Sequence, residues 1–134
     1  MCSSDLLMEL NASRTAARTD ASGEPILMLE QDRALWDQRQ IRRGMQAHGR
    51  ARELDGAGGF YALQAAIIAC HAQASTADET DWPRISGLYA ELAALVRSPI
   101  IELNRAVAVG MAFGPEAGLE IGRASCRERV CYVV

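Results

Sequence analysis

The chain has 134 residues, of which 49% are hydrophobic and 23% are charged, so it is long enough and apolar enough to fold around a core. Residues 1–120 carry 11 arginines against 16 acidic residues, a balance of −5 that argues against DNA binding by this chain, since DNA binding needs a basic surface. No apolar run approaches the roughly 20 residues of a membrane-spanning helix.

The first half of the chain predicts two helices joined by an irregular segment. A first helix starts at Ser3 or Ser4 and continues to about Arg18, and residues 20–23 form a turn. Residues 24–31 are short, apolar and contain a proline, which indicates an extended segment or one edge of a small β-hairpin.

The next helix begins after Asp32 or Asp37, either of which is a good N-cap, and ends near residue 54. Ile41, Met45, His48 and Arg52 share one face of this helix at helical spacing.

The second half predicts three helices separated by short turns. Residues 55–59 are rich in glycine and are the clearest internal boundary, and an apolar helix follows at 60–73. Asp81 caps a helix with Pro83 in its first turn, and a further helix covers 99–113. This pattern predicts an all-α fold of stacked helical hairpins, similar to tetratricopeptide repeats.

Three segments of the second half resemble one known family. Residues 59–74 read GFYALQAAIIACHAQA, residues 80–83 read TDWP, and residues 100–109 read IIELNRAVAV. They resemble, in order and spacing, the carboxy-terminal helical region of bacterial extracytoplasmic-function (ECF) RNA polymerase sigma-70 factors that carry a tetratricopeptide-like extension. LEQDRALWD at 29–37 and NASRTAARTD at 11–20 resemble the same family, so the resemblance covers about residues 6–119.

The resemblance implies a function for a longer parent protein. Such a parent would initiate transcription at specific promoters with core RNA polymerase. It would contact promoter DNA through two amino-terminal helical domains, expected to lie outside this chain. The chain itself would be the regulatory or scaffolding extension, acting by contact with protein, with a regulator as a possible partner. The alternative from another class is a free-standing helical-repeat adaptor unrelated to transcription.

The last residues depart from the family pattern. Residues 121–130 resemble one reading frame of a sequencing-adapter sequence, so we expect the tail 121–134 not to be native and to interrupt the helix that starts near residue 116. The less favoured alternative is a divergent basic terminal helix. The predicted organisation is therefore 1–54 for the first helical part, 55–59 for the break, 60–120 for the tetratricopeptide-like helices, and 121–134 for the tail.

The densest cluster of polar and aromatic residues lies before the second helix and consists of Gln31, Asp32, Arg33, Trp36 and Asp37. One interpretation is a protein-contact surface, since Arg and Trp are favoured at interface hot spots. The other is a structural latch in which Arg33 pairs with Asp37 and Trp36 packs in the core. The second interpretation is favoured because aromatic residues at such spacing usually pack.

A second candidate is formed by Glu102, Asn104 and Arg105, which interrupt an apolar helix. They either bind a partner on a concave surface or form an internal network with Glu102 and Arg105 paired at i, i+3. The network is favoured because a buried arginine needs a partner.

No enzyme, metal site or cofactor is predicted. Cys70 and His71 lack enough further ligands for zinc, and residues 56–59 lack the lysine and the strand–loop–helix context of a phosphate-binding loop. Outside the tail only Cys2 and Cys70 remain, so we expect reduced thiols and a cytoplasmic protein.

Overall fold

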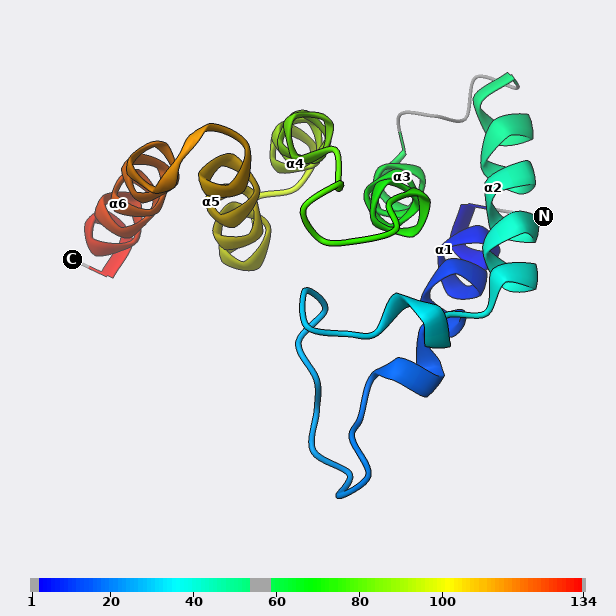
Figure 1. Ribbon diagram of the computed structural model, residues 1–134. Coiled ribbons are helices and arrows are strands. Elements are labelled where there is room, and N and C mark those ends of the chain that lie inside the picture. Colours follow the sequence, from blue (N-terminus) through cyan, green and yellow to red (C-terminus); the bar gives the residue numbers. More distant parts are fainter. Residues whose placement is uncertain (1–2, 54–58, 134) are drawn as a thin grey trace. The chain divides into compact units, whose positions relative to one another are not determined.

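A computed structural model describes residues 3–53 and 59–133, and these residues confirm the all-α prediction. They contain six α-helices and no strand (Figure 1). The helices are α1 (Ser3–Ala12), α2 (Gln38–Glu53), α3 (Phe60–Gln73), α4 (Trp82–Leu95), α5 (Pro99–Phe113) and α6 (Pro115–Val133), with two 3-10 helices, η1 (Thr15–Ala17) and η2 (Arg33–Leu35). The chain forms two compact units, Met1–Thr80 and Asp81–Val134. The predicted boundary at 55–59 lies almost wholly outside the described residues.

In the first unit, helices α1, α2 and α3 each pack against the other two. Their shared core consists of Leu6, Leu10, Ala47, Ala65 and Ala69. Gly44 allows α2 to approach α1 closely, because a Cβ atom at this position would lie 2.6 Å from a methyl carbon of Leu10. The small residues at these crossings bring the three helices close together.

The first helix ends earlier than predicted, at Ala12 instead of Arg18. The hydroxyl of Ser13 donates to the carbonyl of Leu10, and the hydroxyl of Thr15 donates to that of Ala12. Such local bonds from Ser and Thr compete with helix continuation. The chain then passes through η1.

The segment predicted at 24–31 as extended or as a hairpin edge is a loop, and no strand forms there. One isolated bridge pairs Thr19 with Pro25, around a turn in which the carboxylate of Asp20 accepts bonds from Ser22 and Glu24. Gly23 has φ 89°, which favours glycine at this position. The turn side chains satisfy the backbone locally, so the pairing does not extend into a ladder.

In the second unit, α4 packs on α5 and α5 packs on α6. Helix α4 begins as predicted, since the carboxylate of Asp81 accepts a bond from the backbone N–H of Arg84 at 3.1 Å. The buried hydrophobic residues are Trp82, Ile85 and Leu92 of α4 and Ile101, Ala106 and Ala108 of α5. The centre of this unit therefore combines large residues of both helices with two alanines of α5.

The prediction that the tail interrupts the last helix is wrong. Helix α6 begins after Gly114, which has φ 103°, and continues to Val133. The tail contains no proline, and Gly122 alone costs about 1 kcal/mol of helix propensity, which does not stop a helix. Gly118 lets α6 approach α5, because an added Cβ would lie 2.6 Å from the carbonyl oxygen of Ala106. Among the described helices, none is long and apolar enough to cross a membrane.

Candidate functional site

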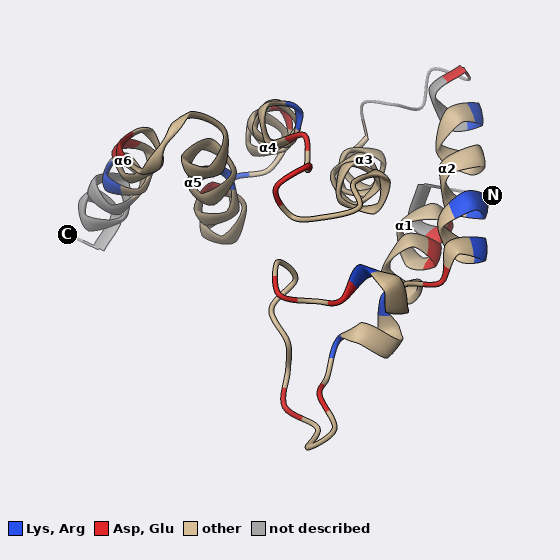
Figure 2. Cartoon of the chain, viewed as in Figure 1, with Lys and Arg blue, Asp and Glu red and all other residues tan. Residues whose placement is uncertain are grey.

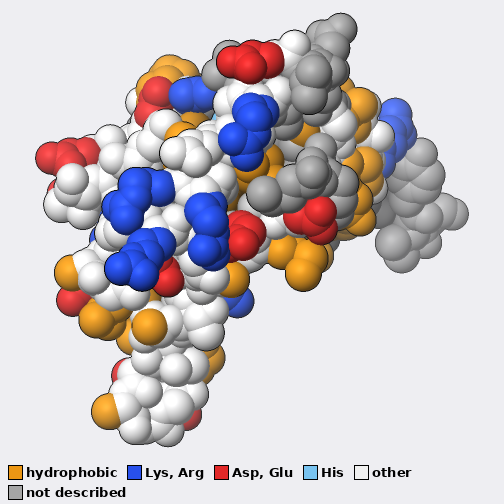
Figure 3. Space-filling model, turned by 90° about the vertical axis from the view of Figure 1, so that its right-hand side faces the viewer, with side chains coloured by type: hydrophobic (Ala, Val, Ile, Leu, Met, Phe, Trp, Pro, Cys, Tyr) orange, Lys and Arg blue, Asp and Glu red, His pale blue; other side chains and the backbone are white. Residues whose placement is uncertain are grey.

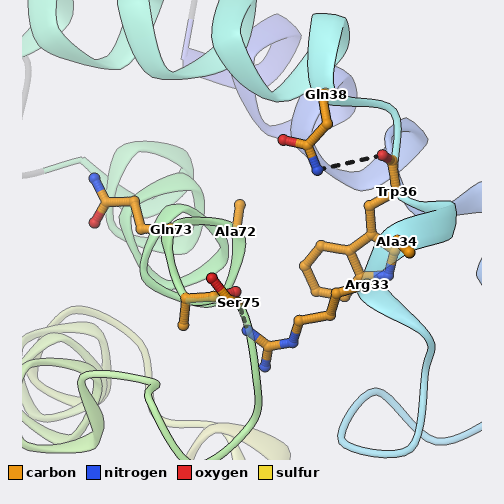
Figure 4. Close-up of a pocket in the computed structure, with 8 residues that line it drawn as sticks. Arg33, Ala34, Trp36, Gln38, Ala72, Gln73 and Ser75 are labelled. Atoms are coloured by element: carbon orange, nitrogen blue, oxygen red, sulfur yellow. Dashed lines mark hydrogen bonds between the residues drawn. The ribbon is translucent and has the colours of Figure 1, made fainter.

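Two members of the cluster predicted at 31–37, Arg33 and Trp36, line a groove in the first unit with a volume of about 360 Å³ (Figure 4). The groove lies between η2, the start of α2 and the end of α3. Arg33, Trp36 and Gln38 contribute to one side of it and Ser75 to the other. The structure therefore brings the cluster against a helix almost 40 residues away along the chain.

Arg33 binds the carboxy-terminal end of α3. Its Nη1 donates to the carbonyl oxygens of His71 at 2.6 Å and Ala74 at 2.8 Å, and its Nη2 donates to the hydroxyl of Thr80 at 3.1 Å. The last carbonyls of a helix lack partners within the helix, and the helix dipole favours a cation there. Burial lowers the pKa of Arg33 from its ordinary value, and the nearby carboxylate of Glu79 opposes this shift. Arg33 thus caps α3.

Trp36 is 3% exposed and packs in a core cluster with Ala17 and Ile41. The guanidinium carbon of Arg33 lies 5.1 Å from the centroid of the indole ring, and that of Arg14 lies 5.8 Å from it. Both distances are within the range of cation–π attraction. The indole therefore holds two arginines beside the end of α3.

The predicted ion pair between Arg33 and Asp37 is wrong. A pair at i, i+4 needs both residues on one α-helical face, but η2 ends at Trp36, whose backbone is extended (ψ 133°). The carboxylate of Asp37 instead accepts bonds from the backbone N–H groups of Arg39 and Gln40 and caps α2. These bonds hold the pKa of Asp37 below its ordinary value.

The two remaining members of the cluster also bind backbone. Asp32 caps η2 by accepting a bond from the N–H of Ala34 at 2.9 Å. The amide nitrogen of Gln31 donates to the carbonyl of Ile26 at 3.1 Å. Gln31, Asp32 and Asp37 therefore use their side chains to fix the local backbone, and Arg33 binds the distant end of α3. These bonds favour the structural interpretation.

Cys70 and His71 lie inside the first unit. Cys70 is 3% exposed, and His71 is 6% exposed. Burial, with the positive charges of Arg33 and Arg14, lowers the pKa of His71 from 6.5 to about 4. The imidazole is therefore neutral at pH 7. Among the described residues, no group of three or more His, Cys, Asp and Glu side chains could hold a metal ion.

The second predicted cluster lies on α5. Arg105 Nη1 is 3.4 Å from Glu102 Oε2, and about a third of each side chain is exposed, so the expected i, i+3 pair is present. The side chain of Asn104 bonds to Tyr89 of α4, and this bond partly offsets the burial that raises the pKa of that tyrosine. The polar residues of α5 thus bind one another and α4.

An exposed apolar stripe on α5 was not predicted. It is formed by Ile100 (70% exposed), Leu103 (62%), Val107 (50%) and Met111 (45%), and we call these four residues the α5 stripe. Their spacing of three, four and four residues places them on one helix face. The sequence shows this spacing, but α5 is apolar on other sides too, so the pattern alone does not say which side is buried.

Comparison with known proteins gives two matches. Residues 6–52 match a family model described as "Family of unknown function (DUF6596)". The chain is 43% identical over 113 residues to "Uncharacterized protein R00370" of Rhizobium meliloti (strain 1021); the match covers 84% of this chain and 26% of that protein. The chain therefore spans about a quarter of the length of the curated relative it matches. No solved structure matches the chain.

Proposed function

We propose that this chain is a protein-contact region of a larger transcription factor of the ECF sigma type. In this proposal the parent protein binds core RNA polymerase and promoter DNA, and this region contacts protein and not DNA. The sequence motifs at 29–37, 59–74 and 100–109 support the family, and the match to one quarter of a longer relative is compatible with a region of a larger protein.

The α5 stripe is the observation that carries the proposed protein contact. Exposed apolar residues scattered singly are ordinary on protein surfaces, but contiguous apolar patches mark interaction sites. Leu103 and Val107 lie at the middle of the stripe, one helical turn apart. The same helix buries Ile101, Ala106 and Ala108 on another side, and the four large side chains of the stripe lie outside that buried side.

The polar cluster at 31–37 is not the contact surface in this proposal. Arg33 and Asp37 already bind helix ends, and Trp36 is in the core. A partner would have to break these bonds to reach the side chains, at a cost of about 1 kcal/mol or more for each bond. The apolar side chains of the α5 stripe make no hydrogen bonds that a partner would have to break.

Binding to core RNA polymerase tests the proposal. The purified chain would be measured against core RNA polymerase of Rhizobium meliloti by biolayer interferometry. Leu103→Ser with Val107→Ser should weaken binding at least tenfold, since both changes lie in the middle of the contact. The matched control is Leu27→Ser with Leu35→Ser, which changes two equally exposed apolar residues of the first unit.

The control should bind like the wild type. Absence of binding by the wild-type chain would contradict a polymerase contact and favour the alternative, a helical-repeat adaptor unrelated to transcription. Equal losses in both double variants would show that binding is nonspecific and does not depend on the α5 stripe.

A further inference from the structure

Helix α2 presents a row of basic side chains to solvent. Five of its exposed polar residues, which we call the arginine face, are Arg39, Arg42, Arg43, Gln46 and Arg50. Apart from the adjacent pair Arg42 and Arg43, they recur at spacings of three and four residues, so they share one side of the helix. The opposite side is buried in the first unit through Ile41, Gly44, Ala47 and His48.

The charge on this face is mostly unbalanced. The 16 residues of α2 include five arginines and a single acidic residue, Glu53, whereas the whole chain has a net charge of −3. Among the described residues, Arg43 has a carboxylate within salt-bridge distance, that of Glu9 at 3.2 Å, whereas Arg39 and Arg42 have none. Figure 2 shows basic positions recurring along α2, and Figure 3 shows arginine side chains gathered on one face.

The face is narrow and has acidic borders. Asp37 lies before its first residue, Glu9 beside its middle and Glu53 at its end. From Arg39 to Arg50 the face is about 16 Å long, given 1.5 Å per helical residue. A long uniform polyanion such as DNA would meet these carboxylates and the net negative charge of the chain. A short acidic segment of a protein could follow the arginines alone.

We propose that the arginine face of α2 binds an acidic protein segment. The geometry fits a helix that carries carboxylates at i, i+3, i+4 and i+11, because Arg39, Arg42, Arg43 and Arg50 have this spacing and lie on one face of α2. This inference deepens the proposed function by giving the chemistry of a protein partner. It rests on the proposed function only in taking the partner to be a protein.

Fluorescence anisotropy with the full chain tests the inference. The probe is a labelled, alanine-based peptide of about 16 residues with glutamates at that spacing. The test variant is Arg39→Gln with Arg42→Gln and Arg50→Gln. The control is Arg84→Gln with Arg97→Gln and Arg123→Gln, three exposed arginines elsewhere, which makes the same change in net charge.

The wild type should bind the peptide, less tightly as salt rises to about 0.15 M. The test variant should lose roughly tenfold in affinity, because each exposed pair contributes a factor of about 1.4 to 5. The control should stay within about twofold, and circular dichroism should show unchanged folding for both. Failure of the peptide to bind, or equal losses in both variants, would overturn the inference.

A DNA duplex without a promoter serves as the second probe. Tighter binding of the duplex than of the peptide, lost in the test variant, would show a nucleic-acid surface and overturn the inference. These outcomes do not depend on core RNA polymerase, so they can be separated from failure of the proposed function.

Discussion

The cluster around Trp36 in the first unit and the α5 stripe in the second unit use their residues in opposite ways. Near Trp36, polar side chains occupy the ends of helices: Arg33 binds the carbonyls of α3, and Asp37 binds the N–H groups of α2. On α5, large apolar side chains such as Leu103 face solvent. A motif rich in Arg, Trp and Asp thus holds the fold together, while an apolar motif is left available for a partner.

The largest expected loss of stability comes from replacing the tryptophan that is buried in each unit. Trp36 is 3% exposed and Trp82 is 8% exposed. Replacing either by alanine should cost about 3–5 kcal/mol in the free energy of unfolding, the usual range for a buried aromatic residue. Urea unfolding followed by circular dichroism measures this. An unchanged midpoint for Trp82→Ala would mean that this residue is available for binding and that the comparison of the two units fails.

Stability should fall in mild acid because of His71. Its pKa is about 4 in the folded chain and about 6.5 when unfolded, so the unfolded state binds the proton more readily as pH falls. The stability that comes from keeping His71 neutral is fully present above pH 6.5 and is lost as the pH falls from 6.5 to 4. Between pH 7 and pH 5 the free energy of unfolding should fall by about 2 kcal/mol. Urea unfolding at both pH values checks this. His71→Gln should remove most of the difference, and an unchanged difference would assign it to another group.

Replacing Arg33, which caps α3, should lower the free energy of unfolding by a smaller amount. Arg33→Met keeps much of the side-chain volume but removes two bonds to the end of α3 and one to the hydroxyl of Thr80, and it should cost on the order of 1.5 kcal/mol. Arg39→Met, on the exposed face of α2, is the control and should change the free energy of unfolding by less than about 0.5 kcal/mol. Equal small effects would mean that Arg33 does not latch α3 and is free to bind a partner.

The smallest expected effect concerns Glu102 and Arg105. Arg105→Met alone should destabilise more than Arg105→Met combined with Glu102→Gln, because the single change leaves a carboxylate without its partner. Since about a third of each side chain is exposed, the coupling should be only about 0.3–0.5 kcal/mol. A double-mutant cycle measures it, and strictly additive effects would show that the two residues do not interact.

The bounds of α3 and α5 and the start of α4 could be predicted from the sequence because local residues mark them. Asp81 caps α4, Pro99 begins α5, and Gly114 ends it. These residues act through backbone geometry and hydrogen bonds within a few positions, so they are visible in the sequence. The early end of α1 depended on the bonds of Ser13 and Thr15, whose hydroxyls are also compatible with a helix.

The partners of the candidate residues could not be predicted in the same way. Arg33 binds atoms of residues 71, 74 and 80, and that contact exists only after α3 packs beside η2. Pairing with Asp37 was the local alternative, and it fails because the helix there is 3-10 and short. The exposed side of α5 was hidden for a related reason, since a helix that is apolar on most sides has no clear polar face to mark the solvent.

The arginine face of α2 was visible in the sequence as arginines at helical spacing, but the net negative charge of the chain obscured it. Net charge describes the average electrostatic field of a protein, whereas a bound partner interacts with the local field at the surface that it contacts. The local spacing on each helix is therefore the better guide to an electrostatic contact in this chain.

Amide hydrogen exchange of the chain with and without core RNA polymerase tests the central claim most directly, because it reports both regions in one experiment. Polymerase should slow exchange along residues 100–111 of α5 and leave residues 31–37 unchanged. Slower exchange at residues 31–37 with no change on α5 would contradict the account, because the cluster around Trp36 would then be the contact surface and the α5 stripe would not.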